Sequence, residues 1–147
     1  MEIKQATILN AEEIAPLFDA YRQFYKQPSD LTGANKYIQT RLSRQDSVIF
    51  FACEDKACVG FVQLYPTFSS IGMGKALILN DLYVEPAHRK KGVGENLLQA
   101  AKDYAARDGA KSLSLSTAID NKAAQTLYER NGYEKDEQFL HYELKMH

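Results

Sequence analysis

The sequence predicts an α+β fold, in which helices flank a central sheet that is mixed but mostly antiparallel. Two observations predict it. The first half of the chain holds short apolar segments joined by a turn, which is typical of a hairpin. In the second half an apolar run, an amphipathic helical pattern and an alternating segment follow one another, as in a strand–helix–strand unit. The length fits one domain, so residues 1–147 are expected to form a single domain.

The first expected element is a short strand over residues 3–9. Asn10 and Glu13 then form the pattern of a capping box, in which two side chains satisfy free backbone N–H groups at the start of a helix. Apolar side chains at helical spacing predict that this helix covers residues 11–26. A Pro-Ser-Asp break ends it, and a second helix is expected over residues 32–44.

Three strands are expected in the middle of the chain. Residues 47–53 and 58–66 are apolar and β-rich, and a polar turn joins them as a hairpin. Residues 67–74 contain serines and two glycines, which predicts a longer turn or loop. Residues 76–84 form an unusually apolar run that ends before Pro86, as expected for the central strand of a sheet.

The last third continues with a helix that closes at Asp108-Gly109. Leucines alternate with serines over residues 111–117, which predicts a strand. Another helix is expected from near Asn121 to Asn131-Gly132, and the segment from Tyr133 to the end is expected to form a final strand pair. The predicted order is therefore β-α-α-β-β-β-α-β-α-β-β.

Composition excludes several classes of protein. The formal net charge of −1 gives no support for binding to nucleic acid or to a membrane surface. No segment approaches the ~20 apolar residues of a membrane span, and the N-terminus lacks a secretory signal, so we expect a cytoplasmic protein. Cys53 and Cys58 flank a turn where a disulfide is geometrically conceivable, but in that compartment two reduced thiols are expected. No metal site is predicted, since the two cysteines lack a nearby histidine pair.

The most informative segment is Arg89-Lys90-Lys91-Gly92-Val93-Gly94, between the apolar run and the next helix. A glycine-containing loop lets backbone N–H groups turn toward one point, and the helix that follows adds free N–H groups and the positive end of its dipole. Such a loop is a cradle for phosphate groups.

A second motif covers residues 121–133, in the form Asn-x-x-Ala-x-x-x-Tyr-x-x-x-Gly-Tyr. The two motifs, separated by one helix and one strand, resemble the coenzyme-binding elements of the GNAT superfamily of N-acetyltransferases, and the element order resembles the GNAT fold over the whole chain. The resemblance implies that the strands over 76–85 and 112–117 diverge at their C-terminal ends and leave a slot for acetyl-CoA.

The resemblance also implies which residues bind acetyl-CoA. No metal is expected to take part in this binding. The loop and the helix start would bind the pyrophosphate, the central strand would pair with the pantetheine arm, and the second motif would lie along its far side. The implied coenzyme-binding residues are Leu82, Tyr83, Val84, Arg89, Lys90, Lys91, Gly92, Val93, Gly94, Asn121, Ala124 and Tyr128.

The reaction that the resemblance implies is direct transfer of acetyl from a thioester to an amine. Tyr128 is assigned as the general acid for the departing thiolate. A backbone N–H at or near Leu82 would meet the oxyanion. The general base stays open: a water chain ordered by Asn80 is one candidate, and the carboxylates of Asp81 and Glu85 are others. By strand alternation Asp81 is expected on the opposite face from Asn80.

We therefore expect an N-acetyltransferase that acts on a primary amine of a small molecule, either a polyamine or an amino-acid-like amine. A peptide or protein N-acetyltransferase is one alternative. A non-catalytic acyl-CoA-binding module is another, which Tyr128 disfavours and which Asn80, in place of the glutamate of some relatives, slightly favours. A homodimer is expected because Phe139 and Tyr142 are aromatic residues in the C-terminal segment that look exposed.

Overall fold

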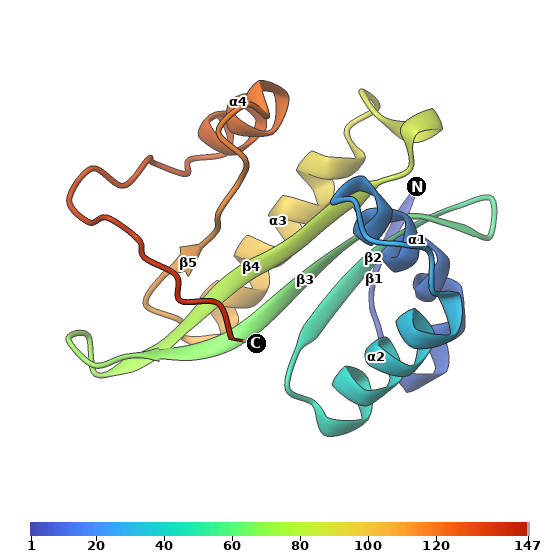
Figure 1. The fold of residues 1–147 in the computed structure, drawn as a ribbon, viewed down its shortest axis with the longest axis horizontal. Helices are drawn as coiled ribbons and strands as arrows, with labels where there is room; N and C mark the ends of the chain where they lie inside the picture. Colours follow the sequence, from blue (N-terminus) through green and yellow to red (C-terminus); the bar gives the residue numbers. More distant parts are fainter. Residues whose placement is uncertain (147) are drawn as a thin grey trace. The chain divides into compact units, whose positions relative to one another are not determined.

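The computed structural model describes residues 1–146 (Figure 1). Its contacts divide the chain into two compact units, one from Met1 to Ser116 and one from Thr117 to the end. The expectation of a single domain over residues 1–147 stays a prediction.

The first unit contains a five-stranded sheet in the order β1-β2-β3-β4-β5 (Figure 1). Neighbouring strands are antiparallel except for β4 and β5, which are parallel, so the predicted mixed and mostly antiparallel sheet is confirmed. Its elements are β1 (Glu2–Gln5), the 3-10 turn η1 (Ile8–Asn10), α1 (Ala11–Phe24), α2 (Leu31–Arg44), β2 (Val48–Glu54), β3 (Ala57–Ser69), β4 (Gly74–Val84), the 3-10 turn η2 (Pro86–His88), α3 (Val93–Asp108) and β5 (Leu113–Ser114).

The two faces of the sheet are covered by different helices. Phe61 of β3 points to the face of α1, where its ring lies 6.2 Å from the ring of Phe18. Gly60, the preceding residue, points to the face of α3, where an added Cβ would lie 3.2 Å from Val93 and 3.3 Å from Leu97. A side chain at Gly60 would therefore push the start of α3 away from the sheet. This close packing fixes where the loop before α3 can lie.

A β-bulge interrupts the pairing of β3 with β4. Gln63 pairs with Asp81 and Leu64 pairs with Leu79, so Asn80 is an extra residue in β4. Because paired residues share a face, the bulge changes which residues of β4 face α3. Leu79 shares the α3 face with Leu64, whereas Asp81 shares the α1 face with Gln63. The bulge therefore places the Asp81 side chain on the face of the sheet that α1 covers.

The second unit contains α4 (Lys122–Arg130). The Oδ1 atom of Asn121 accepts a hydrogen bond from the N–H of Ala124 at 3.1 Å, and this cap defines where the helix begins. The helix ends at Asn131, and Gly132 adopts a left-handed φ of 93°. After Gly132 the chain turns back, so that the ring of Tyr133 packs edge-on against that of Tyr128 with 5.8 Å between centroids.

Three sequence predictions at the ends of the chain are wrong in detail. The strand expected over 3–9 ends at Gln5, because Thr7 caps the turn η1 instead. The capping box joins Thr7 and Asn10, while the Asn10 amide donates to Glu13 and makes no cap at α1. The final strand pair after Tyr133 is absent from the described residues, where the segment is exposed and pairs with no strand.

Boundaries in the middle of the chain also shift. The loop expected over 67–74 is shorter, since β3 extends to Ser69 and β4 begins at Gly74. The strand expected over 111–117 is reduced to the two residues of β5. The helices α1 to α4 lie where the apolar spacing predicts them, within a few residues at each end. Among residues 1–146, no helix is long and apolar enough to span a membrane.

Candidate functional site

The loop between β4 and α3 has a backbone that presents N–H groups at the start of the helix. Lys90 and Gly92 adopt left-handed φ angles of 62° and 84°. Gly92 is the N-cap of α3, and no side chain caps the helix there. The first N–H groups of a helix have no partner within the helix. Gly94 lies in this first turn, and the side chain of Val93 is buried in the core, so the two contribute to an anion site through their backbone.

The side chain of Arg89 braces this loop against β4. Its Nε donates to the carbonyl oxygen of Val84 at 2.8 Å, and its guanidinium lies 5.5 Å from the centroid of the Tyr83 ring. Lys90 and Lys91 are exposed. Arg89 is exposed as well, but its side chain also holds the strand end and the loop together.

The edge of β4 that faces away from β3 is largely unpaired. Pairing with β5 stops at Ile78 and Ser114, so among the described strands β4 has no second neighbour beyond that point. The N–H of Glu85 donates to Val59 on β3, so by strand alternation the backbone groups of Leu82 and Val84 point to the other edge. The carbonyl of Val84 is occupied by Arg89, which leaves Leu82 as the open pairing position.

Asp81 lies in a buried polar network that the bulge makes possible. Its side chain is 3% exposed, and its Oδ2 accepts a hydrogen bond of 2.7 Å from Nε2 of Gln63. Ser47 donates in turn to Oε1 of Gln63 at 2.9 Å. The Nδ2 of Asn80 donates to Oδ1 of Asp81 at 3.1 Å. The hydroxyl of Tyr21 is a further hydrogen-bond partner of the carboxyl.

The contact between Asn80 and Asp81 corrects the expectation that they point to opposite faces. Adjacent strand residues normally do so, but the extra residue of a bulge breaks the alternation. Burial raises the pKa of the Asp81 carboxyl above its ordinary value, and the hydrogen bonds from Gln63, Tyr21 and Asn80 act in the opposite direction. The result is a buried carboxylate held by uncharged donors.

Sequence reasoning missed Gln63 and the contact between Tyr21 and Asn80, although the segment from Tyr21 to Tyr25 resembles the acceptor side of small-amine acetyltransferases. The hydroxyl of Tyr21 donates to the carbonyl oxygen of Asn80 at 3.2 Å, 59 residues away in the chain. Its ring lies 5.1 Å from that of Tyr25 and 6.3 Å from that of Tyr83. The spacing of Tyr21 and Tyr25 on one helical face is visible in the sequence, but it indicates a buried face and not which strand the face covers.

Glu85, another candidate base, lies at the end of β4. Its Oε1 is 3.7 Å from Nδ1 of His88 within the turn η2. Glu85 and Asp81 are therefore in different surroundings, one beside the loop and one inside the sheet.

In the second unit, Asn121, Ala124 and Tyr128 come from one helix. The Oδ1 of Asn121 is used as the helix cap, so its Nδ2 is the group that remains to donate to a ligand. Tyr128 follows two turns later and packs against Tyr133. Burial raises the pKa of Tyr133 to about 12.

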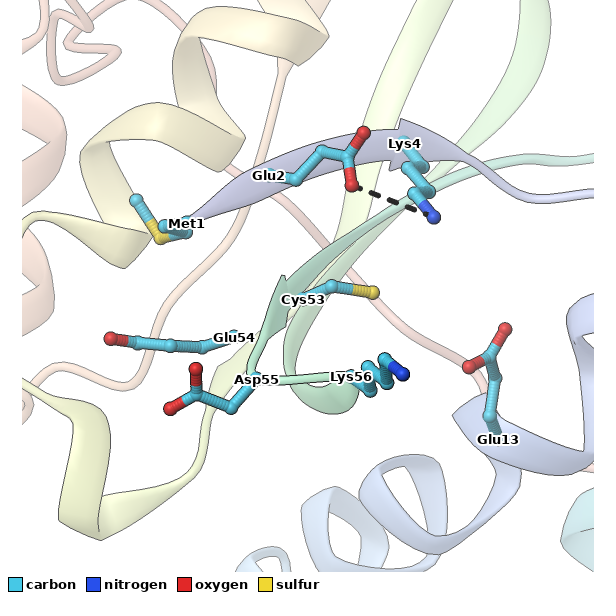
Figure 2. Close-up of a pocket in the computed structure, with 8 residues that line it drawn as sticks. All are labelled: Met1, Glu2, Lys4, Glu13, Cys53, Glu54, Asp55 and Lys56. Atoms are coloured by element: carbon cyan, nitrogen blue, oxygen red, sulfur yellow. Dashed lines mark ion pairs between the residues drawn. The ribbon is translucent and has the colours of Figure 1, made fainter.

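A surface pocket of about 580 Å³ lies elsewhere (Figure 2). Charged side chains of β1, α1 and the β2–β3 turn line it, together with Cys53, and Lys4 and Glu2 form an ion pair of 3.6 Å there. No predicted site residue lines it. Cys53 and Cys58 lie opposite each other in the register of the hairpin, and both are free thiols. Within residues 1–146, no group of three or more His, Cys, Asp or Glu side chains gathers to hold a metal.

Comparisons with known proteins agree with this architecture. Residues 13–133 match the model of the acetyltransferase (GNAT) family. The chain is 53% identical, over 146 residues, to the uncharacterized N-acetyltransferase YhfO of Bacillus subtilis (strain 168), which covers 99% of this chain and 98% of that protein. It is 32% identical over 75 residues to the thialysine N-epsilon-acetyltransferase of Bos taurus, which covers 51% of this chain and 44% of that protein.

Among solved structures, the chain is similar to the crystal structure of a probable acetyltransferase, with a TM-score of 0.94 and 40% identity. The alignment covers 100% of this chain and 99% of the other. Family, relatives and fold all point the same way. The chain belongs to the acetyltransferase (GNAT) family and is an N-acetyltransferase.

Proposed function

We propose that the protein transfers the acetyl group of acetyl-CoA directly to a primary amine of a small molecule. One observation carries the proposal furthest. The uncapped start of α3, with Gly92 in a left-handed conformation, follows after the turn η2 on the strand whose edge is unpaired at Leu82, and Arg89 ties this loop to the strand end. An anion site next to a free strand edge suits a ligand that has a pyrophosphate at one end and an amide-containing arm at the other.

Within this proposal the pyrophosphate binds to backbone N–H groups of residues 89–94, and Lys90 and Lys91 add positive charge. The pantetheine arm pairs with the backbone of Leu82, and Asn121 donates to it through Nδ2. Tyr83 supports the site indirectly, since its ring holds the Arg89 guanidinium.

The chemistry requires two proton movements. An alkylamine has a pKa near ~10 and must lose a proton before it attacks the thioester carbon. The oxyanion of the tetrahedral intermediate is stabilised by a backbone N–H near the bulge, at Leu82. Tyr128 protonates the thiolate as the carbon–sulfur bond breaks. The Oδ1 of Asn80 accepts from the incoming ammonium or from a water molecule, while its Nδ2 is held by Asp81.

Two features favour a small amine over a peptide. The relative from Bos taurus is named for thialysine, which is an amino acid with a side-chain amine. The aromatic rings of Tyr21, Tyr25 and Tyr83 lie close together beside the bulge, and aromatic faces attract organic cations.

The test is release of free thiol from acetyl-CoA in the presence of a panel of polyamines, lysine analogues and peptides. We expect amine-dependent thiol release that is greatest with a small primary amine, and a product that carries the acetyl group on that amine. Thiol release with peptides alone would show that the acceptor is a peptide and not a small amine. Binding of acetyl-CoA without transfer to any amine would contradict the proposed activity.

A further inference from the structure

The Asp81 carboxylate lacks a countercharge. Its three hydrogen-bond partners, on Gln63, Asn80 and Tyr21, are all neutral donors. In the part of the chain that the structure describes, no cation pairs with it. Burying a carboxylate is costly unless it is hydrogen-bonded and paired, so a buried carboxylate with neutral partners is a site where a positive charge or a proton is accepted.

The hydroxyl of Tyr21 connects this carboxylate to the aromatic residues at the surface of α1. It donates to the Asn80 carbonyl oxygen at 3.2 Å and is also a hydrogen-bond partner of the Asp81 carboxyl. Both groups are acceptors, so the single hydroxyl proton goes to one of them at a time, and a hydroxyl that donates can also accept from a third group. The ring of Tyr21 contacts that of Tyr25, which is 47% exposed. Tyr21 therefore bridges the exposed side of the aromatic group and the buried acid.

We propose that Asp81 is the proton acceptor for the amine substrate, and that the Tyr21 hydroxyl carries the proton to it. This inference rests on the proposed function. Tyr21 then has a catalytic role, because its hydroxyl contacts the ammonium group of the substrate. The acceptor binds as a primary alkylammonium ion.

The proton of the ammonium reaches Asp81 by way of the Tyr21 hydroxyl. An N–H bond of the ammonium breaks and its proton goes to the Tyr21 oxygen, while the original hydroxyl proton of Tyr21 moves to an oxygen of Asp81. The neutral amine then forms the C–N bond and gives the tetrahedral intermediate, and the C–S bond breaks as the oxyanion forms the carbonyl again. A second proton leaves the nitrogen as the amide forms, which balances the proton that the thiolate takes up. Asp81 afterwards returns its proton to solvent through Tyr21.

The surroundings of Asp81 suit this role. Burial raises the pKa of the carboxyl, and a carboxylate of higher pKa is a stronger base. Gln63 on β3 and Asn80 on β4 are uncharged, so they orient the carboxylate without holding a competing proton. Tyr65 on β3 is another titratable group near it, and the Tyr65 hydroxyl is hydrogen-bonded to that of Tyr37 of α2 at 2.7 Å. On α1 the facing group is Tyr21 itself.

The test compares Tyr21→Phe and Asp81→Asn with the wild-type protein on two acceptors. The first is the best alkylamine of the panel, and the second is its analogue with a trifluoromethyl group on the carbon that bears the amine, whose lowered pKa leaves the amine mostly neutral at neutral pH. The control is Tyr37→Phe, which removes a hydroxyl from the same group of aromatic rings but from one bonded to Tyr65. Coenzyme affinity and thermal unfolding are measured for every variant.

With the alkylamine, both variants should lower kcat by roughly 10²–10⁴-fold, and their residual activity should rise steadily with pH as free amine accumulates. With the fluorinated amine the loss should disappear. Tyr37→Phe should behave like the wild type on both. If Asp81→Asn does not fold, Tyr21→Phe alone decides.

Equal losses on both acceptors would overturn the inference, because they would show that the residues only maintain the shape of the site. Unchanged activity of Tyr21→Phe on the alkylamine would overturn it as well. Neither outcome would affect the proposed acetyl transfer, which fails only if the wild-type protein acetylates no amine.

Discussion

Gln63 and Asp81 face each other across β3 and β4, and the Nε2 of Gln63 donates to the Asp81 carboxylate at 2.7 Å. The direction of this bond is set on the other side of the amide, where Ser47 donates to Oε1. The Gln63 amide therefore has one orientation that satisfies both neighbours. Ser47, the residue just before β2, thereby determines that Asp81 meets an N–H group, which favours the ionised form of the carboxyl.

Gln63→Glu keeps the size of this side chain and replaces the donor with a second carboxylate. Two buried like charges raise each other's pKa, so we expect the variant to lose about 3 kcal/mol of unfolding free energy at pH 7. The loss should shrink as the pH falls and one carboxyl takes up a proton. Ser47→Ala is the matched control, with an expected cost of about 1 kcal/mol at both pH values. Urea unfolding at pH 7 and pH 5 measures both, and an equal deficit of Gln63→Glu at the two pH values would contradict the prediction.

Gly92→Ala tests the loop before α3. The glycines at the two ends of α3, Gly92 and Gly109, both have a left-handed φ and open space where a Cβ would go. Alanine at either position should cost about 1–2 kcal/mol of stability. Only Gly92→Ala should also weaken acetyl-CoA binding, by about tenfold, because a methyl group there disturbs one or two backbone contacts of ~1 kcal/mol to phosphate. Calorimetry that gives the same affinity for both variants would remove the loop from the coenzyme site.

Tyr128→Phe tests the general acid. It removes one oxygen and keeps the ring contact with Tyr133, so acetyl-CoA affinity should be retained while turnover falls by roughly 10²–10⁴-fold. Tyr133→Phe is the control in the same ring pair. Its hydroxyl is buried with no hydrogen-bond partner in the described structure, so its removal should leave turnover unchanged and add about 1 kcal/mol of stability. A fully active Tyr128→Phe variant would mean that the thiolate leaves unaided.

Asp19 should make stability depend on acid pH. It is buried on α1, and a hydrogen bond from the Asp30 N–H, followed by one from Ser29, lowers the pKa of its carboxyl below the ordinary 3.8. A lowered folded-state pKa stabilises the protein above the unfolded value, and this contribution is lost as the pH falls through the folded value. Asp19→Asn should therefore be less stable than the wild type at pH 7 and closer to it below pH 3.8. Urea unfolding across that range checks the convergence.

We also predict self-association into a homodimer. Phe139 and Tyr142 are 68% and 90% exposed in the C-terminal segment, and contiguous exposed apolar side chains mark association surfaces. Light scattering at micromolar concentration should give about twice the chain mass of 16.6 kDa. Tyr142→Ser should lower the measured mass, and a wild-type mass of 16.6 kDa would contradict the prediction.

Elements whose pattern is local could be predicted from the sequence. The left-handed glycine at the end of α3, the Asn121 cap and the apolar run of β4 are each encoded within a few residues. The capping box lies one turn earlier than the pattern of Asn10 and Glu13 predicts, because Thr7 offers the same chemistry three residues before Asn10.

Long-range features could not be read in the same way. The bulge at Asn80 depends on the register between β3 and β4, and the alternation of residues along one strand does not predict it. For the same reason Asp81 was expected on the wrong side relative to Asn80, and Gln63 looked like any strand residue. The final strand pair failed because a strand needs a neighbour, which the pattern of a single segment cannot supply.

Because of the bulge, β4 can lose one residue without any other side chain moving to the opposite face of the sheet. Every other residue from Gly74 to Val84 has a partner on β3, whereas Asn80 has none. If Asn80 were deleted, Leu79 and Asp81 would become adjacent and would keep their present partners on β3, Leu64 and Gln63. Every apolar side chain of β4 would stay on the face of the sheet that it now occupies. Deleting Leu82 instead would carry Tyr83 to the face of α3. Asn80 is thus the position at which the strand can be shortened without altering the core, so its contacts with Tyr21 and Asp81 can be removed while the fold stays intact.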